Sequence, residues 1–126
     1  MSAAAPTEAP LAPPVLGIPS APEPEVDADR ASLLLDLDAS WPVFAEHFPG
    51  NPMFPGSASV RLLLDLARRI HPGTRGLRDV RFARPLVPPA RARFTAERLA
   101  DASVRVTAQI EQDDGTWTVA IRGEVT

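Results

Sequence analysis

The chain has 126 residues, of which 44% are hydrophobic and 23% charged, and its formal net charge is −3, a size and composition that suit one globular domain. The absence of cysteine excludes a disulfide framework, a zinc–thiolate site and a cysteine nucleophile, and with two histidines we expect no metal or other cofactor. No apolar run approaches the roughly 18 to 20 residues of a membrane span, so we expect no membrane partner. No basic residue precedes Arg30, which argues against a targeting signal, and we expect a cytoplasmic protein. No region is strongly basic, so we expect no nucleic acid as a partner.

Residues 1–29 form a segment rich in proline and alanine that carries five acidic residues and no basic one. The segment has no helical or strand period and too little apolar surface to offset its ordering entropy. We therefore expect a disordered acidic tail and assign the domain to residues 30–126. Leu33, Leu35 and Leu37 then alternate with other residues, which predicts a strand, followed by a loop that contains Trp41.

Residues 47–56 read HFPGNPMFPG, and their three prolines and two glycines allow neither a helix nor a strand to run through them. We expect a stiff loop. Ser57 is suitably placed to cap a helix, and apolar residues from Val60 to Ile70 surround most of its circumference. The sequence therefore predicts one buried helix, which ends at the Pro72-Gly73 pair.

From Leu77 onward the apolar residues recur at every second position, which predicts three or four antiparallel strands. Asp113-Asp114-Gly115 indicates a hairpin turn, after which Trp117 and Val119 are expected to share a face with Ile121. A strand, a stiff loop, a buried helix and a run of strands together predict an α+β domain. In it, a curved antiparallel sheet is wrapped around one buried helix.

The sequence HFPGNPMFPG, followed by a buried helix, resembles the FabA/FabZ superfamily of 3-hydroxyacyl-carrier-protein dehydratases, and in particular its short ApeI-like members. Residues 80–88, VRFARPLVP, resemble the strand and turn that follow the helix in that superfamily. The resemblance covers about residues 32–126 and implies a hotdog fold and a dimer with a continuous sheet. It also implies acyl carrier protein as a partner, whose phosphopantetheine-linked acyl chain enters at the subunit interface.

Dehydration of a 3-hydroxyacyl thioester requires a base for the C2 proton, a proton donor for the departing hydroxyl and a hydrogen-bond donor to the thioester oxygen. His47 occupies the position at which members of the superfamily use a histidine as the base. Gly56 suits the third role, because a backbone N–H at the amino end of a helix points toward developing negative charge. The candidate substrate-binding residues are Phe48, Phe54, Pro55 and Arg61.

The proton donor is the difficulty, because the related enzymes place Asp or Glu fourteen positions after the histidine, where this chain has Arg61. Arginine is not a general acid. Three interpretations remain: the chain is half of a heterodimer and receives its acid from the partner, a homodimer uses Asp65 or Glu46, or the subunit binds acyl chains or carrier protein without catalysis. We favour the first, since Asp65 is also spaced to pair with Arg61 or Arg69.

Hotdog domains also include thioesterases, but the loop that begins at His47 favours dehydration over hydrolysis. A group of arginines follows the helix, and we expect most of them on solvated strand faces and turns. Some are candidates for recognising an acidic carrier protein. These arginines are Arg75, Arg78, Arg81, Arg84, Arg91 and Arg93.

Overall fold

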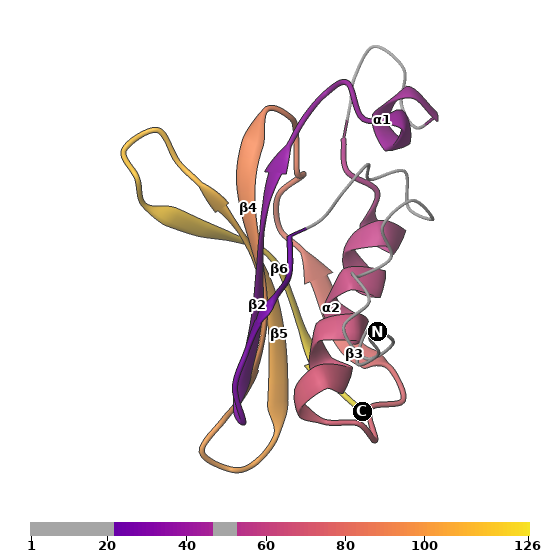
Figure 1. Cartoon of the computed structure of the whole chain (residues 1–126), viewed down its shortest axis with the longest axis vertical. Helices are drawn as coiled ribbons and strands as arrows, with labels where there is room; N and C mark the ends of the chain where they lie inside the picture. The colour runs from indigo at the N-terminus through magenta and orange to yellow at the C-terminus, as the bar shows by residue number, and fades with distance from the viewer. Residues whose placement is uncertain (1–21, 47–52) are drawn as a thin grey trace, which may run out of the picture.

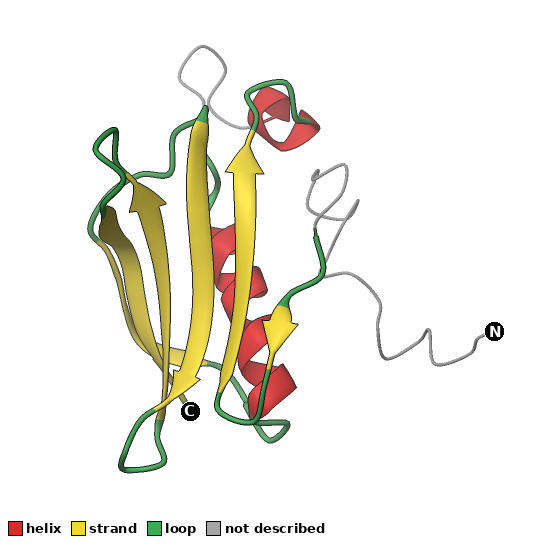
Figure 2. Ribbon diagram, turned by 60° about the vertical axis from the view of Figure 1, so that its left-hand side comes forward, coloured by secondary structure: helices red, strands yellow, loops and turns green. Residues whose placement is uncertain are grey.

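The structure is a computed structural model that describes residues 22–46 and 53–126. Its strands are β1 (Glu25–Val26), β2 (Arg30–Leu37), β3 (Leu77–Phe82), β4 (Ala90–Arg98), β5 (Val104–Glu111) and β6 (Trp117–Val125), and its helices are α1 (Pro42–Glu46) and α2 (Gly56–Ile70). The strands form one antiparallel sheet in the order β1-β2-β4-β5-β6-β3 (Figure 2). Helix α2 lies against one face of this sheet (Figure 1). The α+β hotdog architecture expected from the sequence is confirmed.

The sheet has one apolar face because apolar residues alternate along its strands. In β2, Leu33 and Leu35 are buried while Leu34 and Asp36 are exposed, as the alternation predicts. Strand β4 continues the buried face with Phe94, which is fully buried. The apolar face is the one that α2 covers.

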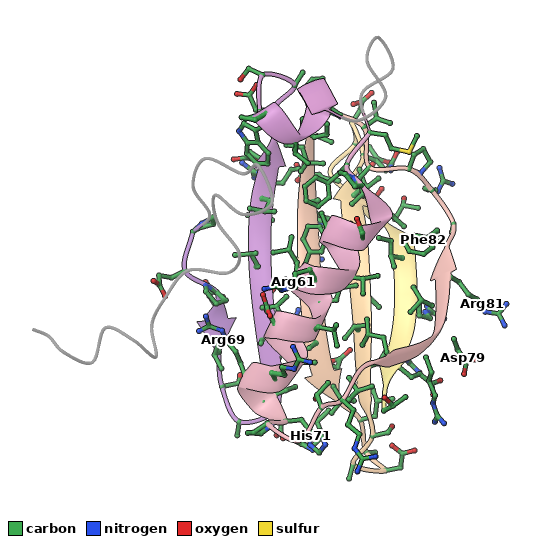
Figure 3. All side chains as sticks on the ribbon, turned by 90° about the vertical axis from the view of Figure 1, so that its right-hand side faces the viewer. Arg61, Arg69, His71, Asp79, Arg81 and Phe82 are labelled. Carbon is green, nitrogen blue, oxygen red and sulfur yellow. The ribbon has the colours of Figure 1, made fainter. Side chains whose placement is uncertain are left out.

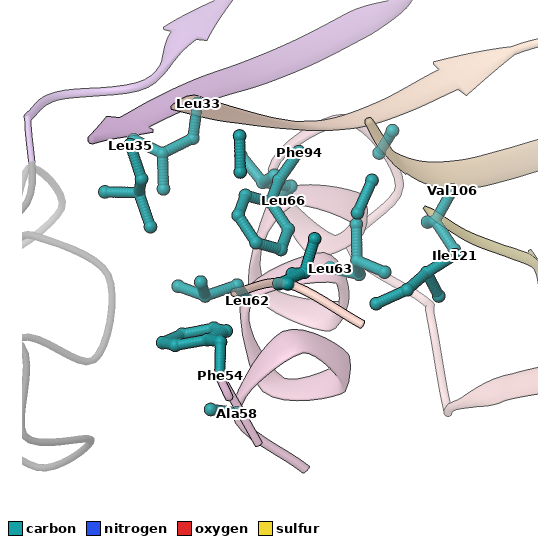
Figure 4. Packing of buried hydrophobic residues seen from close by; sticks show 14 of the residues in the cluster. Leu33, Leu35, Phe54, Ala58, Leu62, Leu63, Leu66, Phe94, Val106 and Ile121 are labelled. Carbon is teal, nitrogen blue, oxygen red and sulfur yellow. The ribbon is translucent and has the colours of Figure 1, made fainter. Parts of the chain in front are cut away.

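Helix α2 packs through a stripe of residues spaced three and four apart. Leu62, Leu63 and Leu66 are fully buried and lie against Phe94 and the other apolar residues of the sheet (Figure 4). Burying each leucine contributes about 1.5–3 kcal/mol. Because Arg61 and Arg68 are exposed, the helix is amphipathic rather than buried on all sides.

The carboxyl end of α2 is fixed by a strand residue. Arg98 of β4 donates a hydrogen bond of 2.7 Å from its Nη2 to the carbonyl oxygen of Ile70, and its Nε lies 3.4 Å from a carboxylate oxygen of Asp29. A guanidinium at this position satisfies a carbonyl that has no partner within the helix and complements the helix dipole. Arg98 therefore connects the helix end to both β4 and the turn before β2.

Aromatic residues extend the core beyond the amino end of α2. The ring centroids of Trp41 and Phe44, of Phe44 and Phe54, and of Phe54 and Phe94 are each 6.2 Å apart. Trp41 and Phe44 lie at α1, a short helix in the segment expected to be a loop. These contacts hold α1 against the end of the core.

Two features of the amino-terminal half differ from the expectation. β1 lies inside the segment assigned to the tail, where Glu25 and Val26 pair with β2. The turn between the two strands is closed by the Asp27 carboxylate, which accepts hydrogen bonds of 2.9 Å from the backbone N–H groups of Asp29 and Arg30. The N-cap of α2 is Pro55 rather than Ser57, and no side chain caps the helix. The remainder of the expected tail, residues 1–21, lies outside the described residues.

A β-bulge in β6 changes the predicted face of Trp117 and Val119. Ala108 pairs with Ile121 but Gln109 pairs with Val119, so β6 holds one extra residue at this point. The extra residue reverses the alternation. Trp117 and Val119 therefore lie on the face away from α2, where the guanidinium of Arg93 is 4.2 Å from the centroid of Trp117, whereas Ile121 keeps the predicted face.

Two leucine substitutions test which sheet face forms the core. Leu63→Ala removes side-chain volume from the contact between α2 and the sheet and should lower the free energy of unfolding by about 2–5 kcal/mol. Leu34→Ala, on the exposed face of β2, is the matched control and should change it by no more than about 0.5 kcal/mol. Urea denaturation of both variants measures the difference, and equal losses would contradict the assigned faces.

Candidate active site

The motif identified in the sequence is described structurally from Met53 onward. His47 and Phe48 lie outside the described residues, so the base and one substrate-binding residue remain predictions. The motif continues through Phe54 and Pro55 to the first residue of α2, Gly56. The described part of the site is therefore the amino end of α2 and the elements around it.

Pro55 and Gly56 shape the amino end of α2. Pro55 has φ −61° and ψ 140°, and its carbonyl oxygen accepts hydrogen bonds of 3.1 Å from the backbone N–H groups of Ala58 and Ser59. The N–H of Gly56 has no acceptor within the described residues. A free N–H at a helix amino end, assisted by the helix dipole, suits the stabilisation of an oxyanion.

Phe82 lies directly over Gly56. A Cβ atom at Gly56 would be 3.1 Å from Cε1 and 3.3 Å from Cζ of the Phe82 ring, so the absence of a side chain allows the ring to approach the helix (Figure 3). Phe82 is the last residue of β3 and is 56% exposed. It was not among the predicted site residues, and the signal for it was its place in the VRFARPLVP stretch.

The surface beside Phe82 is open and partly apolar. β3 pairs with β6 on one side and ends the sheet on the other. Val60 and Leu64 follow Gly56 at four-residue spacing along one side of α2, and both are half-buried. Gly56, Val60 and Leu64 thus lie along one side of α2, and Phe82 covers the first of them; Val60, Leu64 and Phe82 are here called the apolar strip.

Arg61 pairs with Asp65, as its spacing predicts. Arg61 Nε lies 3.7 Å from Asp65 Oδ2, and their side chains are 53% and 21% exposed. Burial raises the pKa of Asp65 above its ordinary value, although the positive charges of Arg61, Arg68 and Arg69 oppose this shift. Desolvation outweighs these charges because exposed guanidinium groups are well screened by water.

Asp65 is far from the Gly56 end of its own helix. The two residues are nine positions apart, which corresponds to two and a half turns and about 13 Å along the helix axis. Asp65 therefore projects from the side of α2 opposite to Gly56 and Phe82. Within one chain, this geometry argues against Asp65 as the acid that would complete a site at Gly56.

The remaining candidates lie in the core or on the surface. Phe54 is 3% exposed and packs between Phe44 and Phe94, and Pro55 is also buried. Arg61 points away from the core (Figure 3). Across residues 22–46 and 53–126, no three His, Asp or Glu side chains are grouped so that they could hold a metal ion, and no helix is long and apolar enough to cross a membrane.

Comparison with known proteins gives one family. The model of the ApeI-like family, described as ApeI dehydratase, matches residues 23–121. The 3-hydroxyacyl-[acyl-carrier-protein] dehydratase FabZ of Symbiobacterium thermophilum is 36% identical over 82 residues, which are 56% of this chain and 57% of that protein. The match thus spans little more than half the length of this curated relative.

Solved structures with the same fold include two dehydratases. The dehydratase heterocomplex ApeI:P from Xenorhabdus doucetiae matches with a TM-score of 0.64 and 22% identity, over 81% of this chain and 89% of that one. The dehydratase domain from the CurF module of the curacin polyketide synthase matches with a TM-score of 0.68 and 14% identity, over 84% of this chain and 42% of that one. At these identities the likeness supports the fold.

A double-mutant cycle tests the contact between Gly56 and Phe82. Gly56→Ala should destabilise the protein more when Phe82 is present than in a Phe82→Ala background, because the added methyl group must displace the ring. We expect a coupling free energy of at least about 0.5 kcal/mol in urea denaturation. In the control cycle, Val26→Ala on β1 replaces Phe82→Ala and should give a coupling near zero. Additive effects in both cycles would place Phe82 away from Gly56.

Proposed function

The chain belongs to the ApeI-like dehydratase family, and from this premise we propose that it dehydrates 3-hydroxyacyl thioesters on acyl carrier protein, together with a second hotdog subunit. The reaction would serve a fatty-acid or polyketide-like pathway in the cytoplasm. The observation that carries the proposal is the N–H of Gly56, which has no acceptor among residues 22–46 and 53–126 and lies at the amino end of α2, beside the edge of β3. A thioester oxygen held there would lie where a second subunit can reach it.

The proposed reaction divides three roles between two chains. His47 removes the proton from C2 of the substrate, and negative charge develops on the thioester oxygen. The N–H of Gly56 stabilises this charge by donating a hydrogen bond to the oxygen. An acid then gives a proton to the C3 hydroxyl, which leaves as water while the C2–C3 double bond forms.

The acid is proposed to come from the partner subunit. In this chain Arg61 stands at the position of the acid in related enzymes, and Asp65 projects from the other side of α2. The apolar strip of Val60, Leu64 and Phe82 offers the surface on which a partner would pack, and the unpaired edge of β3 offers backbone groups for a continuous sheet. The solved ApeI:P structure of the same fold is named as a heterocomplex.

A subunit that binds acyl chains or carrier protein without catalysis is the second candidate. The observation that favours it is again Arg61, a permanent cation whose side chain is 53% exposed where related enzymes have a carboxylic acid. The two candidate functions differ in whether they require catalytic turnover. Only the enzymatic proposal requires turnover that depends on His47.

Reconstitution with a partner separates the two candidates. We expect the isolated chain to be inactive on a 3-hydroxyacyl carrier protein and a mixture with a hotdog subunit from the same pathway to be active. His47→Ala should lower kcat in the mixture by about a hundredfold or more, because it removes the base. The measurement is the ultraviolet absorbance of the unsaturated thioester. Turnover that persists in His47→Ala would refute the proposed mechanism.

Arg61→Asp tests whether the missing acid alone makes the isolated chain inactive. A carboxyl group at this position should give the isolated chain measurable dehydration activity if a homodimer otherwise forms the complete site. The variant also loses the ion pair with Asp65 and places two carboxylates four residues apart, which should cost about 0.2–0.5 kcal/mol of helix stability. Arg68→Asp makes the same charge change further along α2 and is the control. Activity in both variants or in neither would show that the position of the acid is not what limits the isolated chain.

A further inference from the structure

Two neighbouring rows of side chains cross the sheet face that points away from α2. The first row is alternately basic and acidic, so that every charge has an opposite charge on the neighbouring strand; its members are Arg30, Glu97, Arg105, Glu124 and Arg78. The second row is uncharged over three strands and then has two adjacent arginines; its members are Ser32, Thr95, Thr107, Arg122 and Arg81. Only the second row ends in two like charges, at the point where β6 meets β3.

Arg81 and Arg122 stand directly opposite each other on adjacent antiparallel strands. Such residues have Cβ atoms about 4.5–5.5 Å apart, and like charges at this separation destabilise a sheet. Both side chains are exposed, and neither forms an ion pair within the described residues. Glu124, which follows Arg122 on the same face of β6, is held by Arg78 at 3.2 Å.

A third arginine joins this pair. The backbone N–H of Arg84 donates a hydrogen bond of 3.3 Å to the carbonyl oxygen of Ala120, two residues before Arg122 in β6. Its side chain is exposed and has no ion-pair partner among the residues that the structure describes. Arg81, Arg84 and Arg122, here called the arginine cluster, are thus three exposed arginines on adjacent stretches of backbone, and none of them forms an ion pair within the described residues.

The two ends of the sheet carry opposite charge. Residues 22–38, which include β1 and β2, hold six acidic residues and one arginine, a net charge of −5. Residues 75–84, which include β3, hold four arginines and one aspartate, a net charge of +3. An approaching acidic molecule is therefore attracted to the β3 end and repelled from the β1 end.

The arginine cluster is next to the candidate active site. Phe82 follows Arg81 in β3 and points to the opposite face of the strand, where its ring lies over Gly56. A partner subunit on the edge of β3 would leave the outer sheet face, with Arg81 and Arg122, open. The cluster would then stay accessible to a carrier protein at the end of β3 that also holds Phe82, although on the other face of the sheet from Gly56.

We propose that the arginine cluster is the docking surface for the acidic face of the carrier protein that delivers the substrate. This inference rests on the proposed function, since it names the surface that recognises the carrier. Arginine suits this role because its planar guanidinium forms paired hydrogen bonds with carboxylates. The cost of placing Arg81 beside Arg122 is removed when acidic groups bind to both.

Charge reversal at the cluster tests the proposal. The double variant Arg81→Glu and Arg122→Glu should raise the Kd for a purified bacterial acyl carrier protein, loaded with a 3-hydroxyacyl chain, by about tenfold or more at low salt. The effect should shrink as salt screens the charges. In the active assembly, KM for the carrier-bound substrate should rise, whereas turnover of the same acyl group as an N-acetylcysteamine thioester should not change.

Two further variants serve as controls for the position of the charge and for folding. Arg30→Glu makes a charge reversal of the same kind at the opposite edge of the sheet and should leave carrier affinity within about twofold of wild type. If charge reversal disturbs folding, the variant Arg81→Gln and Arg122→Gln, with an unchanged unfolding midpoint, should still weaken carrier binding.

Three results would overturn the inference: no binding of the carrier to the wild-type chain, an equal loss with Arg30→Glu, or an equal loss of turnover with the small thioester. If the assembly shows no turnover but carrier binding still depends on the arginines, the docking surface stands and the enzymatic proposal fails. If turnover occurs while charge reversal leaves the carrier KM unchanged, the enzymatic proposal stands and the docking surface fails.

Discussion

Leu62, Leu63 and Leu66 of α2 are buried without residual exposure against one face of the sheet, and this contact determines where both ends of the helix lie. At the carboxyl end, the guanidinium of Arg98 holds the last helical carbonyl. At the amino end, the same packing brings Gly56 under the ring of Phe82. The position of the Gly56 N–H beside the edge of the sheet is thus a consequence of core packing, not of the motif alone.

The alternation of apolar residues was sufficient to predict the sheet, the main helix and the α+β class, because burial of one face imposes a period that is visible in the sequence. It was not sufficient for β6, where one extra residue moved Trp117 and Val119 to the other face. A bulge depends on the partner strand as well as on local composition. β1 was also missed, since two residues are too short a strand to show a period.

The candidate site was predictable to the extent that its residues form a continuous motif. Gly56 was named as a candidate in this way, and the spacing of Arg61 and Asp65 predicted their ion pair. Phe82 was missed as a site residue because its contact with Gly56 joins positions 26 residues apart, and an exposed aromatic in a strand has no sequence pattern that reveals its neighbour. The acid is a harder case, because the partner subunit proposed to supply it belongs to another sequence.

The bulge in β6 also separates the environments of the two tryptophans of the chain. Trp41 stacks on Phe44 at α1, immediately before the motif, whereas Trp117 lies on the outer face beneath the guanidinium of Arg93. The two indoles therefore emit from opposite sides of the sheet. With one of them replaced by phenylalanine, the fluorescence of the other would report events on its own side alone, which gives the molecule an intrinsic optical probe for each surface.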